Sequence, residues 1–211
     1  MEYKYIVIEG NIGAGKTSLV THIADELKAR IIFEQFAGNP FLPMFYQDPD
    51  RYSFQLEISF LADRYQQLKK ELSIIDNSPP VLIADYCFSK SLIFAGVTLK
   101  EEEYNIYRQI YDILSMHFPA PDLYVYLHLP VDALLSNIRK RGREYEYTIN
   151  AGYLNKIQKA YFNYFNLQTA MKILILDISN IDFVNDQKDF RIISDYIVKR
   201  EHLKGISQII L

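Results

Sequence analysis

Short apolar runs alternate along the chain with longer stretches in which apolar residues recur every three or four positions. The short runs predict buried strands, and the longer stretches predict the helices that connect them. This alternation is typical of an α/β fold with a parallel sheet. We therefore expect five parallel strands covered by helices on both faces, at residues 5–8, 31–33, 81–84, 123–129 and 173–177.

The helical stretches have clear apolar faces and clear ends. Leu19, Ile23 and Leu27 share one face of the first helix, and Gly96 predicts a break in a shorter one. Residues 205–211 are either ordered against the sheet or loose, and no motif marks 180–211. The other predicted helices cover 54–72, 104–114, 153–168 and 189–202, and the predicted turns lie at 39–43, 77–80 and 118–122.

Length and composition narrow the class of protein. A chain of 211 residues suits one buried α/β domain, so we expect a single domain over 1–211. The net charge of −3 argues against a general nucleic-acid-binding protein. Cys87 is the single cysteine, and no apolar run reaches the roughly 20 residues of a membrane span. The cytoplasm is the expected location, with no nucleic acid and no membrane as partner.

The segment after the first strand fits the phosphate-binding pattern G-x-x-x-x-G-K-[ST]. Its glycines let backbone N–H groups turn toward a phosphate, the following helix adds partial positive charge, and its lysine adds a full charge. Its threonine offers a hydroxyl to Mg²⁺. The segment therefore predicts a nucleoside triphosphate site, made by Gly10, Asn11, Ile12, Gly13, Ala14, Gly15, Lys16, Thr17 and Ser18.

Further elements decide which kind of phosphate-binding protein this is. GTPase switches also carry D-x-x-G and N-K-x-D, but no such D-x-x-G occurs here, and Asn155-Lys156 leads into Ile-Gln. Glu34 follows the second strand, Asp85 follows the third, and RKRGREYE at 139–146 follows the fourth. Phosphoryl transfer to an alcohol needs a base, an acid at the metal and positive charge on the transferring group. Because parallel strands end at one edge of a sheet, we expect these groups to meet there.

Four ordered segments then carry a resemblance to a known family. They are IEGNIGAGKTS, FEQFAGNPFLPMFYQDPDRYSF, FLADRYQQL, and RKRGREYE leading to AGYLNKIQKAYFNYF. Over about 5–165 the chain resembles the deoxynucleoside kinases, nearest to their bacterial purine-deoxynucleoside members. The resemblance implies a P-loop kinase fold, ATP as phosphate donor, Mg²⁺ as cofactor, a deoxynucleoside as acceptor in nucleotide salvage, and a homodimer.

The resemblance also implies roles for individual residues. Glu34 would be the base at the sugar 5′-hydroxyl, while Tyr46 and Glu146 would bind the 3′-hydroxyl. Asp85 would be the acid at the metal, together with Thr17.

A lid at about 139–150 is implied as well. Arg139, Arg141 and Arg143 would close over the donor phosphates, and Arg141 and Arg143 would act in catalysis with Lys16.

The sequence departs from the family pattern at two places. Where the family commonly has an acid-Arg-Ser triplet, this chain reads Asp85-Tyr86-Cys87, so the cation that neutralises Glu34 is undefined. Where many members have a glutamine at the nucleobase, this chain has Glu57.

Glu57 and Arg64 lie within about 20° of each other on a helical wheel, at the rim of the apolar face. They are either a surface charge pair or two contacts to the nucleobase. A carboxylate only accepts hydrogen bonds, and guanine presents N–H donors, whereas N1 of adenine is an acceptor. Arg64 would donate to O6 and N7. We therefore expect deoxyguanosine as first substrate and deoxyadenosine as second.

The sequence is also compatible with two other functions. A nucleoside monophosphate kinase of the thymidylate kinase type has a similar P-loop sheet, but it needs a cationic site for the acceptor phosphate. A non-catalytic nucleotide-binding regulatory protein would fit the altered triplet Asp85-Tyr86-Cys87.

Overall fold

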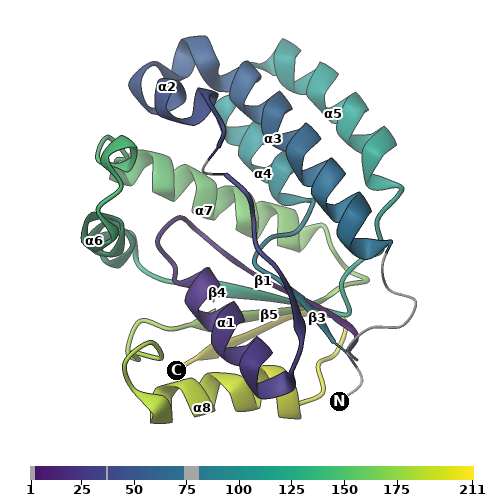
Figure 1. Cartoon of the computed structure of the whole chain (residues 1–211), viewed down its shortest axis with the longest axis vertical. Helices are drawn as coiled ribbons and strands as arrows, with labels where there is room; N and C mark the ends of the chain where they lie inside the picture. The colour runs from purple at the N-terminus through teal and green to yellow at the C-terminus, as the bar shows by residue number, and fades with distance from the viewer. Residues whose placement is uncertain (1–2, 37, 74–80) are drawn as a thin grey trace.

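The chain is built on a parallel sheet with helices on both faces (Figure 1). This computed structural model describes residues 3–36, 38–73 and 81–211. Within them the sheet has six strands in the order β2-β3-β1-β4-β5-β6. The strands are β1 (Tyr5–Gly10), β2 (Arg30–Ile32), β3 (Leu82–Ala84), β4 (Leu123–His128), β5 (Lys172–Asp177) and β6 (Gly205–Ile210).

The helices connect successive parallel strands and cover the sheet. Pairing with β3 on one side and β4 on the other places β1 inside the sheet, where the strand order reverses. The helices are α1 (Lys16–Leu27), α2 (Phe41–Gln47), α3 (Pro49–Leu72), α4 (Lys90–Thr98), α5 (Glu101–Ser115), α6 (Val131–Arg141), α7 (Ala151–Asn166) and α8 (Gln187–Ser194), with short turns η1 (Glu144–Glu146) and η2 (Asp195–Lys199).

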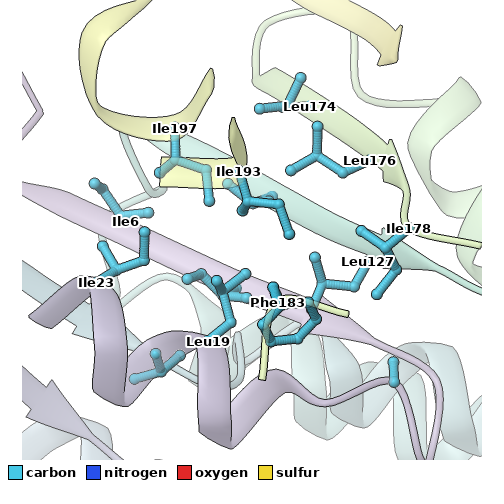
Figure 2. Close-up of a cluster of buried hydrophobic side chains, with 14 of the residues drawn as sticks. Ile6, Leu19, Ile23, Leu127, Leu174, Leu176, Ile178, Phe183, Ile193 and Ile197 are labelled. Carbon is cyan, nitrogen blue, oxygen red and sulfur yellow. The ribbon is translucent and has the colours of Figure 1, made fainter. Parts of the chain in front are cut away.

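Side chains of each central strand alternate between two buried clusters. Ile6 and Ile8 of β1 belong to the cluster under α1 and α8, which Figure 2 shows in close-up. Tyr5 and Val7 belong to the cluster under α3, α4, α5 and α7. Because both faces are buried, the central strands appear in sequence as nearly continuous apolar runs. The predicted fold class and the cover on both faces are confirmed.

The predicted number of strands was wrong. The sixth strand, β6, pairs in parallel with β5 from Lys172↔Gly205 to Asp177↔Ile210. It lies at the sheet edge, where its outward residues Ile206 and Ile210 are exposed and Ile209 packs against the core. An edge strand that is buried on one face only gives a weak sequence pattern, so its pairing with β5 decides its structure.

One smaller difference concerns a helix. Gly96 does not break a helix, because α4 continues through it to Thr98. The position is exposed, and a Cβ there would make only ordinary contact with the ring of Tyr104, at 3.6 Å. The predicted turn at 77–80 lies outside the described residues.

The β6 pairing predicts different effects for two neighbouring isoleucines. Replacing Ile209 with Ala removes apolar contacts to the core and should lower the free energy of unfolding by about 1–2 kcal/mol. Ile210→Ala, at a side chain that is 72% exposed, should change it by less than about 0.5 kcal/mol. Urea unfolding measures both. Equal effects would contradict the observed register.

Candidate active site

The P-loop connects β1 to α1 in a conformation that requires glycine. Gly13 has φ of 86°, and a Cβ on it would lie 2.7 Å from the carbonyl oxygen of Leu134 in α6. Gly15 also has φ of 86°, and its Cβ position lies 3.0 Å from the ring of Phe183. Both residues therefore combine a backbone that disfavours side chains with close neighbours.

Lys16 lies at the start of α1 with its ammonium group turned back over the loop. It donates hydrogen bonds to the carbonyl oxygens of Gly10 at 2.9 Å and Asn11 at 3.0 Å. Burial and the nearby Lys90 lower the pKa of Lys16 to about 8. The lysine is still mainly charged at neutral pH, at the place where the pattern predicts phosphate contacts.

Thr17 and Asp85 form a hydroxyl–carboxylate pair beside the loop. The Thr17 hydroxyl donates to Asp85 Oδ2 at 3.0 Å, and Asp85 Oδ1 accepts the backbone N–H of Glu34 at 2.7 Å. Burial raises the pKa of Asp85. Asp85 thus connects the ends of β2 and β3 to the start of α1. Hydroxyl and carboxylate oxygens are the ligands that Mg²⁺ prefers, so the pair fits the predicted metal site.

Glu34, after β2, is held by two cations. Its Oε1 contacts Arg64 NH2 at 2.7 Å, and its Oε2 contacts Lys90 Nζ at 2.5 Å. Burial would raise the pKa of Glu34, but Lys90 and Arg64 outweigh burial and lower it to about 2. The carboxylate is therefore ionised throughout the neutral range. It still has lone pairs that can accept a hydrogen bond from a hydroxyl group.

Lys90 is the cation that the sequence analysis did not identify. Tyr86, which stands where the family pattern has arginine, is fully buried and donates its hydroxyl to Gln67 Oε1 at 2.8 Å. Lys90 begins α4 one helical turn further along and reaches Glu34 instead. The sequence signal that could have identified this cation was a lysine four residues after the position of the missing arginine.

Glu57 and Arg64 of α3 are both buried, which excludes a surface charge pair. The hydroxyl of Thr98 donates to Glu57 Oε1 at 2.9 Å. Burial raises the pKa of Glu57 to about 7, although Arg64 and the Thr98 hydrogen bond act in the opposite direction. Arg64 itself donates to Glu34 and, through NH1, to Ser91 Oγ at 2.9 Å. The two residues thus face one cavity but have different partners.

The segment after α6 brings two arginines to one buried carboxylate. Glu146 of η1 accepts Arg141 Nε at 3.1 Å and Arg143 NH1 at 3.3 Å. Tyr46 lines the same cavity as these three side chains. Arg139 is exposed and is absent from the described lining of either active-site cavity, while its neighbour Lys140 lines one of them.

Two neighbouring cavities meet at the P-loop. Both are lined by Lys16, Thr17, Arg141 and Arg143. The first cavity, here the acceptor cavity, also has Glu34, Tyr46, Glu57, Arg64, Lys90 and Glu146 in its wall. The second, here the donor cavity, is lined by the P-loop from Gly13 to Ser18 and by residues of α6.

The donor cavity has a further wall that the sequence analysis missed. Residues of the loop after β5, between Ile178 and Asn185, line it. Figure 2 shows Ile178 and Phe183 of this loop among the core side chains, with Phe183 next to Leu19 of α1. This wall could have been predicted from the position of the loop, which follows the carboxyl end of a parallel strand, where ligand-binding loops occur.

The strand order, the glycine loop and the paired cavities define a P-loop kinase. One cavity contains the phosphate-binding loop, and the other presents a carboxylate beside it. The same arrangement is required for transfer of a phosphoryl group from a nucleotide to a second ligand.

Comparison with known proteins identifies the family. The model of the family described as "Deoxynucleoside kinase" matches residues 6–202, so the chain belongs to the deoxynucleoside kinase family and is an enzyme of that class. It is 36% identical to a deoxyguanosine kinase of Bacillus subtilis (strain 168), over 92% of this chain and 95% of that protein. It is 29% identical to a deoxyadenosine/deoxycytidine kinase of the same strain, over 93% of both chains.

A solved structure agrees with this assignment. Deoxyadenosine kinase from M. mycoides with bound dATP superposes with a TM-score of 0.78 at 25% identity, covering 92% of this chain and 98% of that one. None of the helices in the described part of the chain has both the length and the apolar character that crossing a membrane requires.

The contacts of Glu34 predict the effect of removing Lys90. Lys90→Met leaves a buried carboxylate with one cation instead of two, and should lower the free energy of unfolding by about 3 kcal/mol at neutral pH. Because the pKa of Glu34 is about 2 in the folded state and 4.5 in the reference state, this contribution is present above pH 4.5 and is lost as pH falls toward 2. The variant's deficit should therefore shrink in acid.

Urea unfolding at neutral and acidic pH tests this prediction. Lys70→Met, at an exposed lysine of α3, is the matched control. A deficit that does not depend on pH would mean that Lys90 stabilises the fold by packing alone.

Proposed function

We propose that the protein transfers the γ-phosphate of ATP to the 5′-hydroxyl of a purine deoxynucleoside, with deoxyguanosine preferred over deoxyadenosine. The observation that carries this proposal is the junction of the two cavities at Lys16, Thr17, Arg141 and Arg143. A donor phosphate on the P-loop would there lie next to an acceptor hydroxyl at Glu34. Proximity of this kind supplies much of the catalysis in phosphoryl transfer.

On the donor side, backbone N–H groups of the P-loop and the ammonium of Lys16 would bind the triphosphate. Thr17 and Asp85 would hold Mg²⁺, which supplies positive charge to the phosphate oxygens when bound. The P-loop binds the phosphates of the donor and does not select its base. The proposal of ATP as donor is therefore based on the family resemblance.

On the acceptor side, Glu34 would accept the hydrogen bond of the 5′-hydroxyl and receive its proton. A carboxylate with a pKa of about 2 is a weak base toward a ground-state alcohol. In a loose transition state, however, the hydroxyl becomes acidic only as it bonds to phosphorus, so the proton can move late. Glu34 would therefore act first by orienting the hydroxyl.

The sugar and the transferring group would be bound by the segment after α6. Tyr46 and Glu146 line the acceptor cavity and would bind the 3′-hydroxyl. Arg141 and Arg143 reach both cavities from this segment and would stabilise the charge of the transferring phosphoryl group. We propose that 139–150 is a lid within a single domain. A role of Arg139 in it rests on the resemblance alone.

At the nucleobase, Glu57 and Arg64 face the acceptor cavity. An ionised Glu57 would accept N–H donors of guanine. Arg64 has two N–H groups beyond those it donates to Glu34 and Ser91, and these would be available to O6 and N7. The similarity to a deoxyguanosine kinase supports this order of substrates.

The two alternatives fit the cavities less well. A monophosphate acceptor would need free positive charge in the acceptor cavity. Among its described residues, however, only Lys16 of the P-loop has no carboxylate partner, because Arg64 and Lys90 are paired with Glu34, and Arg141 and Arg143 with Glu146. The case for a purely regulatory nucleotide-binding protein depends on the absence of a cation near Glu34. Lys90 supplies that cation, which weakens the case.

The expected assembly and location remain proposals. We propose a homodimer formed through the long helices, as the family resemblance implies. The cytoplasm stays a prediction from sequence.

The first prediction from this proposal concerns the acceptor. With ATP and Mg²⁺, deoxyguanosine and deoxyadenosine should release ADP, and nucleoside monophosphates should not. A coupled ADP-release assay with the four deoxynucleosides and their monophosphates as acceptors measures this. Phosphorylation of monophosphates alone would support the thymidylate kinase type, and silence with every acceptor would support the regulatory protein.

The second prediction concerns Glu34. Glu34→Gln keeps a hydrogen-bond acceptor at the hydroxyl but removes the charge that takes up the proton, so kcat should fall by about 10² or more. Nucleoside binding, measured by calorimetry, should be retained. Glu102→Gln, at an exposed residue of α5, should be unchanged. Normal turnover in Glu34→Gln would remove this residue from the mechanism.

A further inference from the structure

Glu57 has an unusual combination of burial and partners. Its side chain is buried, yet it faces the acceptor cavity. Oε1 accepts the Thr98 hydroxyl, whereas Oε2 is buried without a hydrogen-bond partner in the described part of the chain. A buried polar atom without a partner is costly, so Oε2 is suited to a group that the ligand brings.

The chemistry of a carboxyl group offers two ways to satisfy that atom. Ionised, it only accepts hydrogen bonds, which fits the N1–H and exocyclic amine of guanine. Protonated, it donates through one oxygen and accepts through the other, which fits N1 and the exocyclic amine of adenine. Each protonation state is thus complementary to one purine. With the other purine, it leaves a hydrogen-bonding group of the base without a partner.

Thr98 allows both states. Its single hydroxyl proton has two acceptors within reach, Glu57 Oε1 at 2.9 Å and the carbonyl oxygen of Phe94 at 3.1 Å. When Glu57 is ionised, the hydroxyl can donate to the carboxylate. When Oε1 carries the proton, the hydroxyl can accept it and donate to the carbonyl, so neither state of the free enzyme leaves the hydroxyl unpaired.

We propose, on the basis of the proposed function, that the protonation state of Glu57 selects the purine: the carboxylate accepts deoxyguanosine, and the carboxylic acid accepts deoxyadenosine. One side chain would then make a single site serve both substrates. The order of preference would depend on pH.

The surroundings of Glu57 place this change near neutrality. Burial raises the pKa of Glu57 to about 7 against the opposing effects of Arg64, Thr98 and Lys90, while Glu34 raises it further. The tyrosines that face it have raised pKa values and stay neutral. The charged and titratable groups around it are Arg64 on α3, Glu34 after β2, Lys90 on α4, Tyr46 on α2, Tyr107 on α5 and Tyr153 on α7.

Lys16 of the active site also has a shifted pKa near this range. The pKa of Lys16 is lowered to about 8, mainly by burial. Lys16 lies at the P-loop and would serve both purines equally. Its titration therefore cancels in the ratio of kcat/KM for deoxyguanosine to kcat/KM for deoxyadenosine, whereas titration of Glu57 does not.

The experiment measures this ratio between about pH 6 and 8, with ATP and Mg²⁺ saturating. If each state accepted one purine only, the ratio would rise by about tenfold per pH unit, and we expect a total rise of at least about tenfold. Glu57→Gln is neutral at every pH and can pair with adenine as the acid does. Its ratio should be independent of pH and lower than that of the wild type at the alkaline end.

Two further variants separate selection from general damage. Thr98→Val removes the hydrogen bond that lowers the pKa of Glu57, so the rise in the ratio should move to higher pH without disappearing. Asp63→Asn replaces an exposed acid on the same helix and should behave like the wild type.

The possible outcomes distinguish this inference from the proposed function. Phosphorylation of both purines with a ratio independent of pH would overturn the inference and leave the kinase assignment standing. A pH-dependent ratio that survives in Glu57→Gln would do the same. Failure of the wild type to phosphorylate either purine at any pH would overturn the proposed function itself.

Discussion

The structure of the acceptor cavity depends on one buried carboxylate, Glu34, and the two cations that hold it. Arg64 comes from α3 and Lys90 from α4, so this ion cluster ties both helices to the carboxyl end of β2. Removing three charges from water is expensive, and such clusters are weak contributors to net stability when intact. Their value here is geometric, because the loss of any one member would leave another buried charge uncompensated.

A second buried carboxylate, Glu9, plays a comparable part beneath the P-loop. It ends the apolar run of β1, with Oε1 accepting the backbone N–H of Cys87 at 3.0 Å and Oε2 accepting the hydroxyl of Tyr161 at 3.0 Å. Burial raises its pKa. Through these bonds the end of β1 is joined to the segment after β3 and to α7. The donor loop and the acceptor wall are therefore positioned by the same strand ends.

Much of this arrangement could be predicted from the sequence, since it follows from local patterns. Apolar runs indicated five of the six strands in the described part of the chain, and glycine spacing indicated the P-loop. The position of acids after strands indicated Glu34 and Asp85. Each of these signals lies within a few residues, and a parallel sheet then brings them to one edge.

The features that the sequence did not reveal depend on contacts between distant segments. Lys90 is an ordinary lysine until α4 is placed beside β2, where it replaces the arginine absent at Tyr86. Strand β6 is weakly patterned until it pairs with β5. The loop from Ile178 to Asn185 has no motif, and only its packing on the P-loop makes it part of the donor cavity. None of these three features lies in the four segments that carry the resemblance to the family.

Glu34 and Glu57, two of the carboxylates that line the acceptor cavity, differ because the nearby cations are shared unequally between them. Glu34 has direct contacts to both Arg64 and Lys90, and its pKa falls to about 2. Glu57 instead accepts a hydrogen bond from the Thr98 hydroxyl. The same cations act on it without direct contact, and its pKa is about 7. Environments that separate two pKa values in this way assign different tasks to like groups. Under the proposed function, the sugar hydroxyl common to all substrates would be bound by a permanently charged acceptor, whereas the base edge that differs between purines would be bound by a group that can change. Lys90 and Arg64 create this division, because their direct contacts outweigh burial at Glu34, whereas burial prevails at Glu57.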